Sequence, residues 1–599
     1  MATDESRNAV MSERMQLNLA RIEELSRRMM TAMAARRPHD PGLDAPGPDL
    51  LAATGMAAWT DFVKNPQRLL EEQASWWGKS LQSYLNAQTA FAASQPAEPV
   101  IVPPADRRFS HPAWESHPWF SYLRQQYLIN TETLQRSIDQ IEGLPPRDEQ
   151  RLRYFTRAII DMMAPVNFFA TNPEALERAR DTEGESLVRG LENLVRDIES
   201  NNGDLLVTLS DPEAFEVGRN LGMTPGQVVF RNRILELIQI TPTTDKVHKI
   251  PLVIFPPWIN KFYILDLKPQ NSLLRWIADQ GFTLFVVSWK NPDPTYADFG
   301  LEDYYREGYL ETFAAIKAIT GEPKINAVGY CIAGTTLSLT LARMAKDKDA
   351  SVKSATFFTT LTDFEDQGEF TPFLSNDFVD GIEREAKASG CLSSQILSRT
   401  FSFLRANDLI WQPAIRSYML GEAPPAFDLL HWNGDGTNLP GRMAIEYLRR
   451  LCQDNSFATT GYELDGQVVR PSDIKIPFCA VACEGDHIAA WAASYAGFRR
   501  FGSKDRTFIL SQSGHIAGIV NPPAKLKYGH YTSPAPMSTL APAQWREGAE
   551  FTPGSWWPRW GAWLAKQSGA KIPAHQPGSH PDYPILGAAP GDYVKRQYA

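Results

Sequence analysis

The sequence predicts an α/β fold with a mostly parallel sheet, preceded by a separate helical region. From about residue 228 onward, short apolar runs that suit buried strands alternate with helix-favouring stretches. The residues before that point show apolar side chains at helical spacing instead. A third observation is the stretch 324–346, which passes from an apolar run through a small-residue turn into a helix.

The composition is that of a globular protein in a reducing compartment. The 599 residues are 43% hydrophobic and 22% charged. A net charge of −9 argues against nucleic acid as the main partner. No apolar run approaches the ~20 residues that span a bilayer, and no signal-peptide core is visible. The five cysteines are scattered and form no Cys-x-x-Cys pair, so we expect a cytoplasmic protein without disulfides, metal or other cofactor.

The N-terminal part divides at proline-rich stretches. Residues 1–97 read as a helical or poorly ordered extension, and 98–222 as a helical domain beyond the proline-rich linker 94–104. The catalytic domain is expected over 223–599. The helices of the extension suit packing against the body of the protein, and contact with a membrane or polymer is the alternative.

Alternating strands and helices organise the rest of the chain. A run of irregular, aromatic-rich sequence at about 370–451 interrupts them, and an insertion there is typical of a cap over an active site. A proline- and glycine-rich tail follows a tryptophan-dense helix at 555–566. The predicted strands are 228–230, 235–240, 251–255, 282–289, 325–328, 352–360, 478–483 and 507–512.

The small-residue turn GYCIAG at 329–334 has the pattern of the nucleophile elbow of the α/β-hydrolases, with cysteine in the serine place. A strand-to-helix turn raises Sγ of Cys331 above the sheet edge, and the helix N-terminus behind it stabilises a thiolate. The alternative is an ordinary buried cysteine in a βα turn.

A thiol nucleophile requires a base and a carboxylate that orients it. In α/β-hydrolases these follow the nucleophile as acid and then histidine, each after a late strand. Asp486 follows the strand 478–483 and His515 follows the strand 507–512, so they are the predicted partners of Cys331. The rivals are Glu484 and His487 on the first loop, and His530, which is expected at the surface.

The backbone should supply two donors to an oxyanion. The N–H of Ile332, directly after the nucleophile, is the first. The second is expected on the loop after the strand 251–255. Because Pro256 and Pro257 have no N–H, this donor must be Trp258 or a later residue, and we assign it to Ile259.

Five separated motifs follow one another in the sequence: PPWINKFYILDL at 256–267, GYCIAG at 329–334, FDLLHWNGD at 427–435, NLPG at 438–441 and SGHIAG at 513–518. Together and in this order they resemble the polyhydroxyalkanoate synthases, and within them the single-subunit class I type. The resemblance extends from about 107 to 594 and leaves 1–94 poorly matched. One departure is Ala333, where elbows of this family usually carry glycine.

The resemblance implies an α/β-hydrolase fold, with Cys331, Asp486 and His515 as a catalytic triad. It implies polymerisation of (R)-3-hydroxyacyl-CoA, most often 3-hydroxybutyryl-CoA, with release of CoA. It also implies a homodimer that acts in the cytoplasm on the surface of polyester granules and carries the growing chain. Side chains in family-like stretches could contact substrate or CoA, with cap packing or a surface salt bridge as the alternative: Asp266, Arg405 and Tyr447.

Two other functions use the same scaffold. A cysteine-dependent ester or thioester hydrolase would share the elbow and triad but transfer the acyl group to water. The insertion 370–451 would exclude water and favours the polymerase. A scaffold without activity would require a missing triad residue, and the sequence contains all three.

Overall fold

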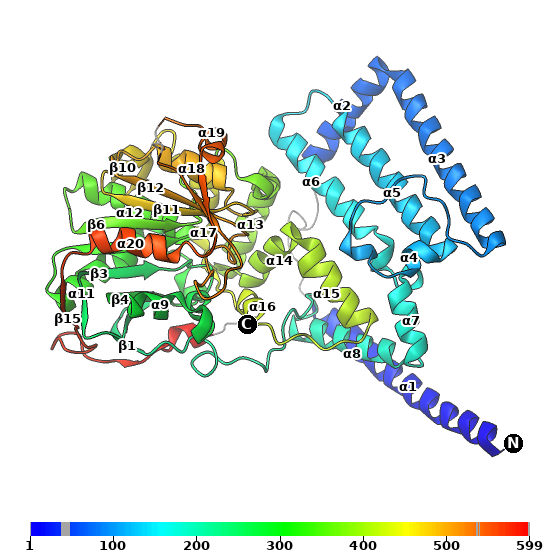
Figure 1. Ribbon diagram of the computed structural model, residues 1–599, viewed down its shortest axis with the longest axis horizontal. Helices are drawn as coiled ribbons and strands as arrows, with labels where there is room; N and C mark the ends of the chain where they lie inside the picture. Colours follow the sequence, from blue (N-terminus) through cyan, green and yellow to red (C-terminus); the bar gives the residue numbers. More distant parts are fainter. Residues whose placement is uncertain (1, 37–47, 535–536, 538, 597–599) are drawn as a thin grey trace. The chain divides into compact units, whose positions relative to one another are not determined.

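This computed structural model describes residues 2–36, 48–534, 537 and 539–596, which form two compact units (Figure 1). The helical unit comprises Met1–Asp211 and Arg399–Pro425, and the α/β unit comprises Pro212–Ser398 and Ala426–Ala599. The segment predicted as a cap is thus divided between the two. The functional domain limits at 97 and 222 stay predictions.

The helical unit is built from helices whose ends follow local signals. Pro66 occupies the first turn of α3, where its missing N–H costs nothing, and separates α3 from α2. Gly184 adopts φ 84° between α7 and α8 and divides the stretch 173–200 into two helices. The helices are α1 (Ala2–Ala34), α2 (Pro48–Lys64), α3 (Pro66–Ala93), α4 (Ala113–Ser116), α5 (Pro118–Asp139), α6 (Pro146–Met162), α7 (Pro173–Asp181) and α8 (Glu185–Ser200).

The inserted segment Arg399–Pro425 is anchored on α8 of the same unit. The amide of Asn193 donates to the carbonyls of Ser417 and Glu422, each at 3.0 Å. The Tyr418 hydroxyl donates to the buried carboxylate of Asp197 at 2.8 Å. These long-range bonds explain why the middle of the insertion belongs to the helical unit.

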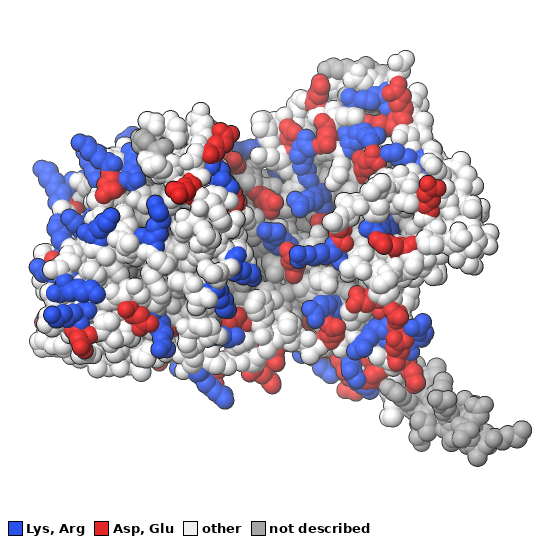
Figure 2. Space-filling view, viewed as in Figure 1, with Lys and Arg blue, Asp and Glu red and all other residues white. Residues whose placement is uncertain are grey.

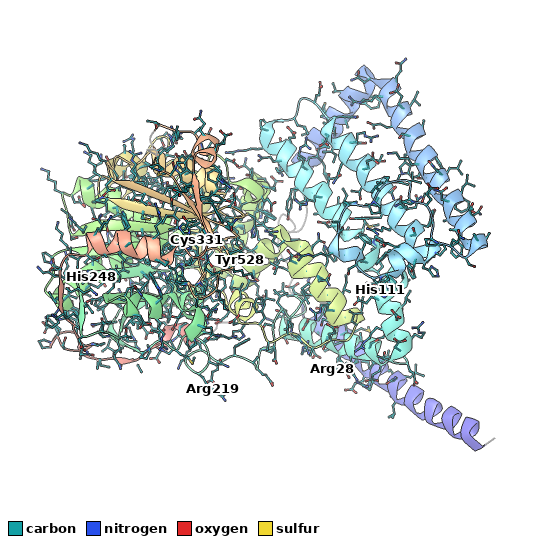
Figure 3. All side chains as sticks on the ribbon, viewed as in Figure 1. Arg28, His111, Arg219, His248, Cys331 and Tyr528 are labelled. Carbon is teal, nitrogen blue, oxygen red and sulfur yellow. The ribbon has the colours of Figure 1, made fainter. Side chains whose placement is uncertain are left out.

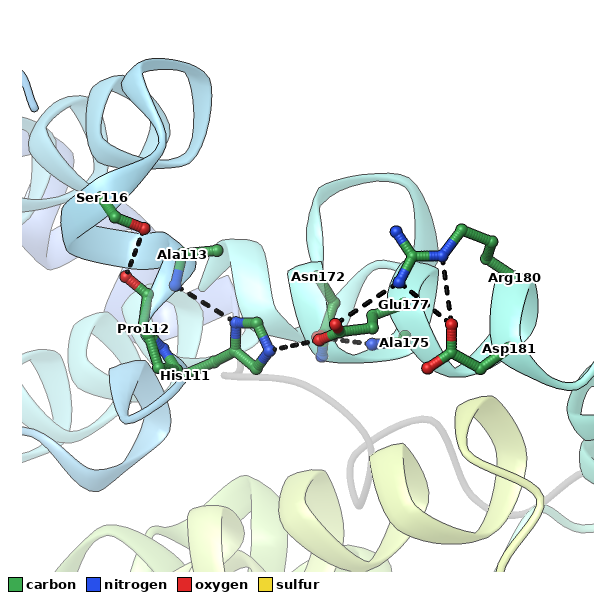
Figure 4. A network of polar contacts seen from close by, with 9 residues as sticks. All are labelled: His111, Pro112, Ala113, Ser116, Asn172, Ala175, Glu177, Arg180 and Asp181. Atoms are coloured by element: carbon green, nitrogen blue, oxygen red, sulfur yellow. Dashed lines mark hydrogen bonds and ion pairs between the residues drawn. The ribbon is translucent and has the colours of Figure 1, made fainter. Parts of the chain in front are cut away.

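A polar network ties the segment before α4 to α7 (Figure 4). The His111 ring lies 2.9 Å from the Glu177 carboxylate and accepts from the N–H of Ala113 at 3.3 Å. Arg180 donates to Glu177 and, at 3.0 Å, to Asp181. Because these groups are largely exposed, we regard the network as a modest contribution to stability.

Within the described residues, twelve strands form one sheet in the α/β unit, in the order β14-β13-β12-β11-β6-β5-β3-β4-β2-β1-β16, with β15 on β3. The six strands from β12 to β4 are mutually parallel. This confirms the predicted α/β fold. The strands are β1 (Gly226–Arg231), β2 (Leu235–Ile240), β3 (Lys246–Phe255), β4 (Phe282–Trp289), β5 (Ile325–Tyr330), β6 (Val352–Phe358), β11 (Phe478–Cys483), β12 (Arg506–Ser511), β13 (His530–Thr532), β14 (Glu550–Thr552), β15 (Lys571–Pro573) and β16 (Gly587–Ala588).

Helices cover both faces of this sheet (Figure 1). The central strands are buried along their whole length, as expected for parallel strands between helical layers. The tryptophan-dense helix packs Trp556, Trp557 and Trp560 into the core against Phe358 and its neighbours. The helices are α9 (Leu273–Asp279), α10 (Leu301–Asp303), α11 (Glu311–Thr320), α12 (Ile332–Lys346), α18 (Trp491–Arg499), α19 (Pro542–Glu547) and α20 (Trp557–Gln567).

The insertion is mainly helical, although its sequence shows no regular helical spacing. Its helices are short and repeatedly pass into π-helical turns, which conceals their periodicity. Two small strands, β7 (Cys391–Leu392) and β8 (Leu439–Pro440), close it at its base. The helices are α13 (Asn376–Ser389), α14 (Ser394–Leu404), α15 (Gln412–Ala414), α16 (Asp428–Gly434) and α17 (Gly441–Glu446).

The proline- and glycine-rich tail is ordered by the sheet. It adds β15 beside β3 and β16 beside β1, which pairs the outer edge of β1. The N–H groups of Asp592 and Tyr593 each donate to the buried carboxylate of Glu236 at 2.9 Å. Long-range pairing of this kind leaves no local periodicity in the sequence.

The charges show no segregation on the visible surface. Figure 2 shows acidic and basic side chains interspersed over the face in view. Within the part of the chain that the structure describes, no helix is both long enough and apolar enough to cross a membrane.

Candidate active site

The strand register brings the sequence-predicted residues to one edge of the sheet. Phe255 of β3 lies opposite Gly329 of β5, so the loop after β3 and the elbow after β5 begin at the same level. Cys483 of β11 lies opposite Ser511 of β12. The loops that carry Asp486 and His515 therefore leave the same carboxyl-terminal edge, where ligands bind in open parallel sheets.

Cys331 lies where β5 meets α12, at the N-cap of that helix (Figure 3). Its backbone adopts φ 54° and ψ −124°, a sparsely populated conformation for a residue other than glycine. Neighbouring residues hold this backbone conformation in place: the Cys331 N–H donates to the Phe358 carbonyl at 2.8 Å. A Cβ on Gly334 would lie 2.1 Å from Thr360 Oγ1, so glycine is required there.

Ala333, the departure from the family pattern, is accommodated. Its methyl is fully buried, and its carbonyl accepts from the Tyr309 hydroxyl at 2.7 Å. The closest approach between strand and helix falls on Gly329 and Gly334, since a Cβ on Gly329 would meet the Gly334 Cα at 2.5 Å. An alanine at 333 therefore leaves the elbow intact.

Asp486 and His515 form a buried pair. His515 Nδ1 lies 2.7 Å from Asp486 Oδ2. The other carboxylate oxygen accepts from the N–H groups of Ile488 and Ala489 at 2.8 and 2.9 Å, which fixes its orientation. Because a carboxylate oxygen can only accept, Nδ1 carries the proton and Nε2 remains for the thiol.

The charge state of His515 follows from its neighbours. Burial by itself lowers the pKa of the ring, but the attraction of Asp486 and Cys331 and hydrogen bonds to both outweigh it. The pKa of His515 therefore lies well above its ordinary value. A protonated imidazole between a carboxylate and Sγ stabilises a thiolate, which is the reactive form of cysteine.

The other cysteines are unsuited to this role. All four are buried, whereas Cys331 is partly exposed. Burial raises the pKa of Cys391 to about 11, and it also raises the pKa of the three remaining thiols above the ordinary value. These three are Cys452, Cys479 and Cys483.

The rival triad residues have other contacts. Glu484 pairs with Arg546 at 2.9 Å, away from His515. The Nδ1 of His530 lies 3.0 Å from the Gly554 carbonyl; the residue is buried on β13, which pairs with both β12 and β14, so its expected surface position is wrong. His487 lies beside Asp486 on the same loop, and His515 is the ring that contacts Asp486.

The predicted oxyanion donors lie on two adjacent elements. Ile332 begins α12, where backbone N–H groups have no partner within the helix. Ile259 lies on the loop after β3, and the Trp258 indole of that loop donates to Thr336 in the first turns of α12 at 3.3 Å. The Asn260 N–H donates to the Pro257 carbonyl, which excludes Asn260 as the donor of the loop.

The three predicted substrate-binding residues have different surroundings. Asp266 is buried and accepts from Thr224 and Ser272, contacts that hold the start of the α/β unit. Arg405 belongs to the helical unit. Tyr447 is different, because its ring packs edge-on against Trp258 at 5.7 Å between centroids. Burial, then Cys452 and Cys331, raises its pKa well above the ordinary value.

Sequence reasoning missed Thr437, a buried residue of the insertion that contacts the loop after β3. It lies between two of the recognised motifs, at 427–435 and 438–441, and belongs to neither. Its position between these motifs was the only feature of the sequence that could have pointed to it.

Comparisons with protein families and with individual known proteins agree with one another. Residues 105–277 match the family described as the N-terminus of poly-beta-hydroxybutyrate polymerase, and residues 251–522 match the alpha/beta hydrolase fold. The chain is 37% identical to a poly(3-hydroxyalkanoate) polymerase of Methylorubrum extorquens, over 94% of this chain and 95% of that protein. It is 41% identical to a poly(3-hydroxyalkanoate) polymerase subunit of Cupriavidus necator, over 82% of this chain and 83% of that protein.

Proposed function

The chain belongs to the poly(3-hydroxyalkanoate) polymerase family, and from this premise we propose that it polymerises (R)-3-hydroxyacyl-CoA with Cys331 as the nucleophile. The observation that carries the assignment of residues is the 2.7 Å contact of His515 with Asp486 at the strand-end edge that also carries Cys331. 3-Hydroxybutyryl-CoA is the proposed substrate.

In the first step the Cys331 thiolate attacks the thioester carbonyl. The new bond joins Sγ to the acyl carbon, and the bond from that carbon to the CoA sulfur breaks. The protonated His515 gives its proton to the departing CoA thiolate, and Asp486 holds the ring in place. The N–H groups of Ile332 and Ile259 receive the charge that develops on the oxygen.

In the second step the 3-hydroxyl of a further hydroxyacyl group attacks an acyl–cysteine. His515 takes the hydroxyl proton, an ester C–O bond forms, and the C–S bond to Cys331 breaks. Exchange between two thioesters is nearly balanced in energy, so the nucleophile can be reloaded in every cycle. A serine would instead form a more stable oxygen ester, from which transfer is harder.

The direct test is incubation with 3-hydroxybutyryl-CoA, following free CoA and turbidity together. We expect CoA release and turbidity to rise together, because each ester bond formed releases one CoA. A thioester hydrolase would release CoA and soluble 3-hydroxybutyrate without turbidity, and that outcome would replace the proposed function by the hydrolase alternative.

We propose that the ring of Tyr447 forms part of the wall of the site that binds the acyl group. This ring packs against Trp258 of the oxyanion loop and against Phe364. Cys331 lies near enough to contribute to the raised pKa of the Tyr447 hydroxyl. Asp266 and Arg405 stay proposals that rest on family-like sequence alone.

We further propose that α2 and α3 provide the contact with the polyester granule in the cytoplasm, and that the active form is a homodimer. Both helices carry large apolar side chains that are well exposed, which marks a surface for association. Helix α3 also packs on α5 through Trp76, whose indole donates to Asn130 at 2.8 Å. The exposed side chains are Leu51, Met56, Trp59, Leu70, Trp77 and Leu81.

Deletion of residues 1–94 tests the granule proposal. We expect CoA release to persist, because the triad residues lie outside the deleted part, while the protein no longer sediments with polyester granules. The measurements are CoA release and granule cosedimentation of the deleted and full chains. Equal cosedimentation of both would contradict the assigned surface, and loss of CoA release alone would show that α1–α3 support catalysis instead.

A further inference from the structure

The loop after β3, residues 256–261, is held by a short segment of the insertion, residues 432–437, within the α/β unit. The Thr437 hydroxyl donates to the Trp258 carbonyl at 2.8 Å, and the Thr437 N–H donates to the Ile259 carbonyl at 3.1 Å. The Trp432 indole donates to the Lys261 carbonyl at 2.8 Å. Three carbonyls of the loop are therefore bound by one short segment.

The first of these bonds sets the direction of an oxyanion donor. The carbonyl of Trp258 and the N–H of Ile259 belong to the same peptide unit, which is planar, and in a trans peptide they point in opposite directions. When Thr437 binds the carbonyl on one side, the Ile259 N–H is aimed away from Thr437. The indole of Trp258 meanwhile holds the loop against α12, whose first turn follows Cys331.

The donor segment is itself fixed by a buried ion pair. Lys261 Nζ lies 2.6 Å from Asp435 Oδ1, and the Tyr263 hydroxyl donates to Asp435 Oδ2 at 2.8 Å. The side chains of Lys261 and Asp435 are only 2% and 9% exposed. Such a pair fixes geometry more than it adds stability. Thr437 is therefore presented to the loop from a rigid neighbour, and it is itself 1% exposed.

We propose that Thr437 is a positioning residue for acyl transfer, which orients the peptide unit that carries the Ile259 N–H toward the oxyanion. The inference rests on the proposed function, because it presupposes an acyl group on Cys331. It assigns a catalytic consequence to the insertion, because this segment would complete the oxyanion site.

The test uses two matched pairs that differ by the hydroxyl alone: wild-type Thr437 against Thr437→Val, and Thr437→Ser against Thr437→Ala. In each pair the residue without a hydroxyl should lower kcat for CoA release by about tenfold, with KM changed less than about twofold. The oxyanion forms only on the way to the transition state, so its donor acts on kcat. Thr437→Ser should recover most of the rate.

Alkylation of Cys331 by iodoacetamide forms no oxyanion, so it distinguishes a misplaced oxyanion donor from a disturbed nucleophile. The rate of alkylation should stay unchanged in Thr437→Val. The control Thr320→Val removes a hydroxyl that donates to the Ile316 carbonyl at 2.7 Å on α11 and should change neither rate. If Thr437→Val folds poorly, the Ser and Ala variants decide the comparison.

Two results would overturn the inference. One is equal kcat with and without the hydroxyl in both pairs. The other is a loss of alkylation that parallels the loss of CoA release, since this would mean that the change disturbs Cys331 and His515 themselves. Failure of the proposed function is a separate outcome, because the wild-type chain would then release no CoA or form no polymer.

Discussion

Replacing Cys331 with alanine is expected to lower the rates of CoA release and of polymer formation by about four orders of magnitude or more. The physical reason is that the four other thiols are buried and lie outside the contact with His515. The chain should stay folded, because a small side chain fits the elbow. The measurement is CoA release from 3-hydroxybutyryl-CoA, with circular dichroism as the control for folding.

Mass spectrometry of the acylated wild type gives the complementary result. We expect the acyl group on the peptide that contains Cys331. An acyl group on Cys479 or Cys483 would contradict the assignment, and so would residual polymer synthesis by Cys331→Ala.

The second large effect concerns the two residues that support the thiol. In Asp486→Asn, the amide nitrogen can face Nδ1 of His515, which then accepts a hydrogen bond and leaves the proton on Nε2. Such a ring cannot take a proton from a chain hydroxyl. The thiol of Cys331 starts from a pKa near ~8.5 and the Nε2–H of His515 can still donate to its thiolate, so acylation of Cys331 persists. We expect about one CoA per active site, followed by near arrest.

His515→Gln should lose both phases, because no imidazole then supports the thiolate. Rapid-quench measurement of the CoA burst and of the steady-state rate distinguishes the variants, with wild type as the reference. If Asp486→Asn loses burst and steady state in equal proportion, the carboxylate acts in both steps through the orientation of His515, and the separate role in elongation is wrong.

The strands and the elbow could be predicted because their signals are local. The runs 282–289 and 478–483 coincide with β4 and β11, since a strand buried on both faces reads as a nearly continuous apolar run. The stretch 235–240 coincides with β2 and was recognised by its alternation of apolar and polar residues. The turn at 329–334 could be predicted for a similar reason, because only small residues fit between a strand and the helix that packs on it.

The insertion and the tail could not be predicted in the same way. The short helices of 370–451 are interrupted by π-helical turns, and the segment Arg399–Pro425 is held by bonds to α8. The tail becomes ordered through β15, β16 and the carboxylate of Glu236. Each depends on partners hundreds of residues away, which single-sequence periodicity does not reveal.

The sequence by itself determined the order of strands and helices, the elbow, and the positions of Asp486 and His515 after their strands, because each follows from residues close together in the chain. Only the tertiary structure decided how these residues meet. The register of β5, β11 and β12 brings them to one edge. The contact of Thr437 with Trp258 joins residues 179 positions apart. A hydrogen bond across that distance has no local signature, since its geometry exists only once the sheet and the insertion have packed.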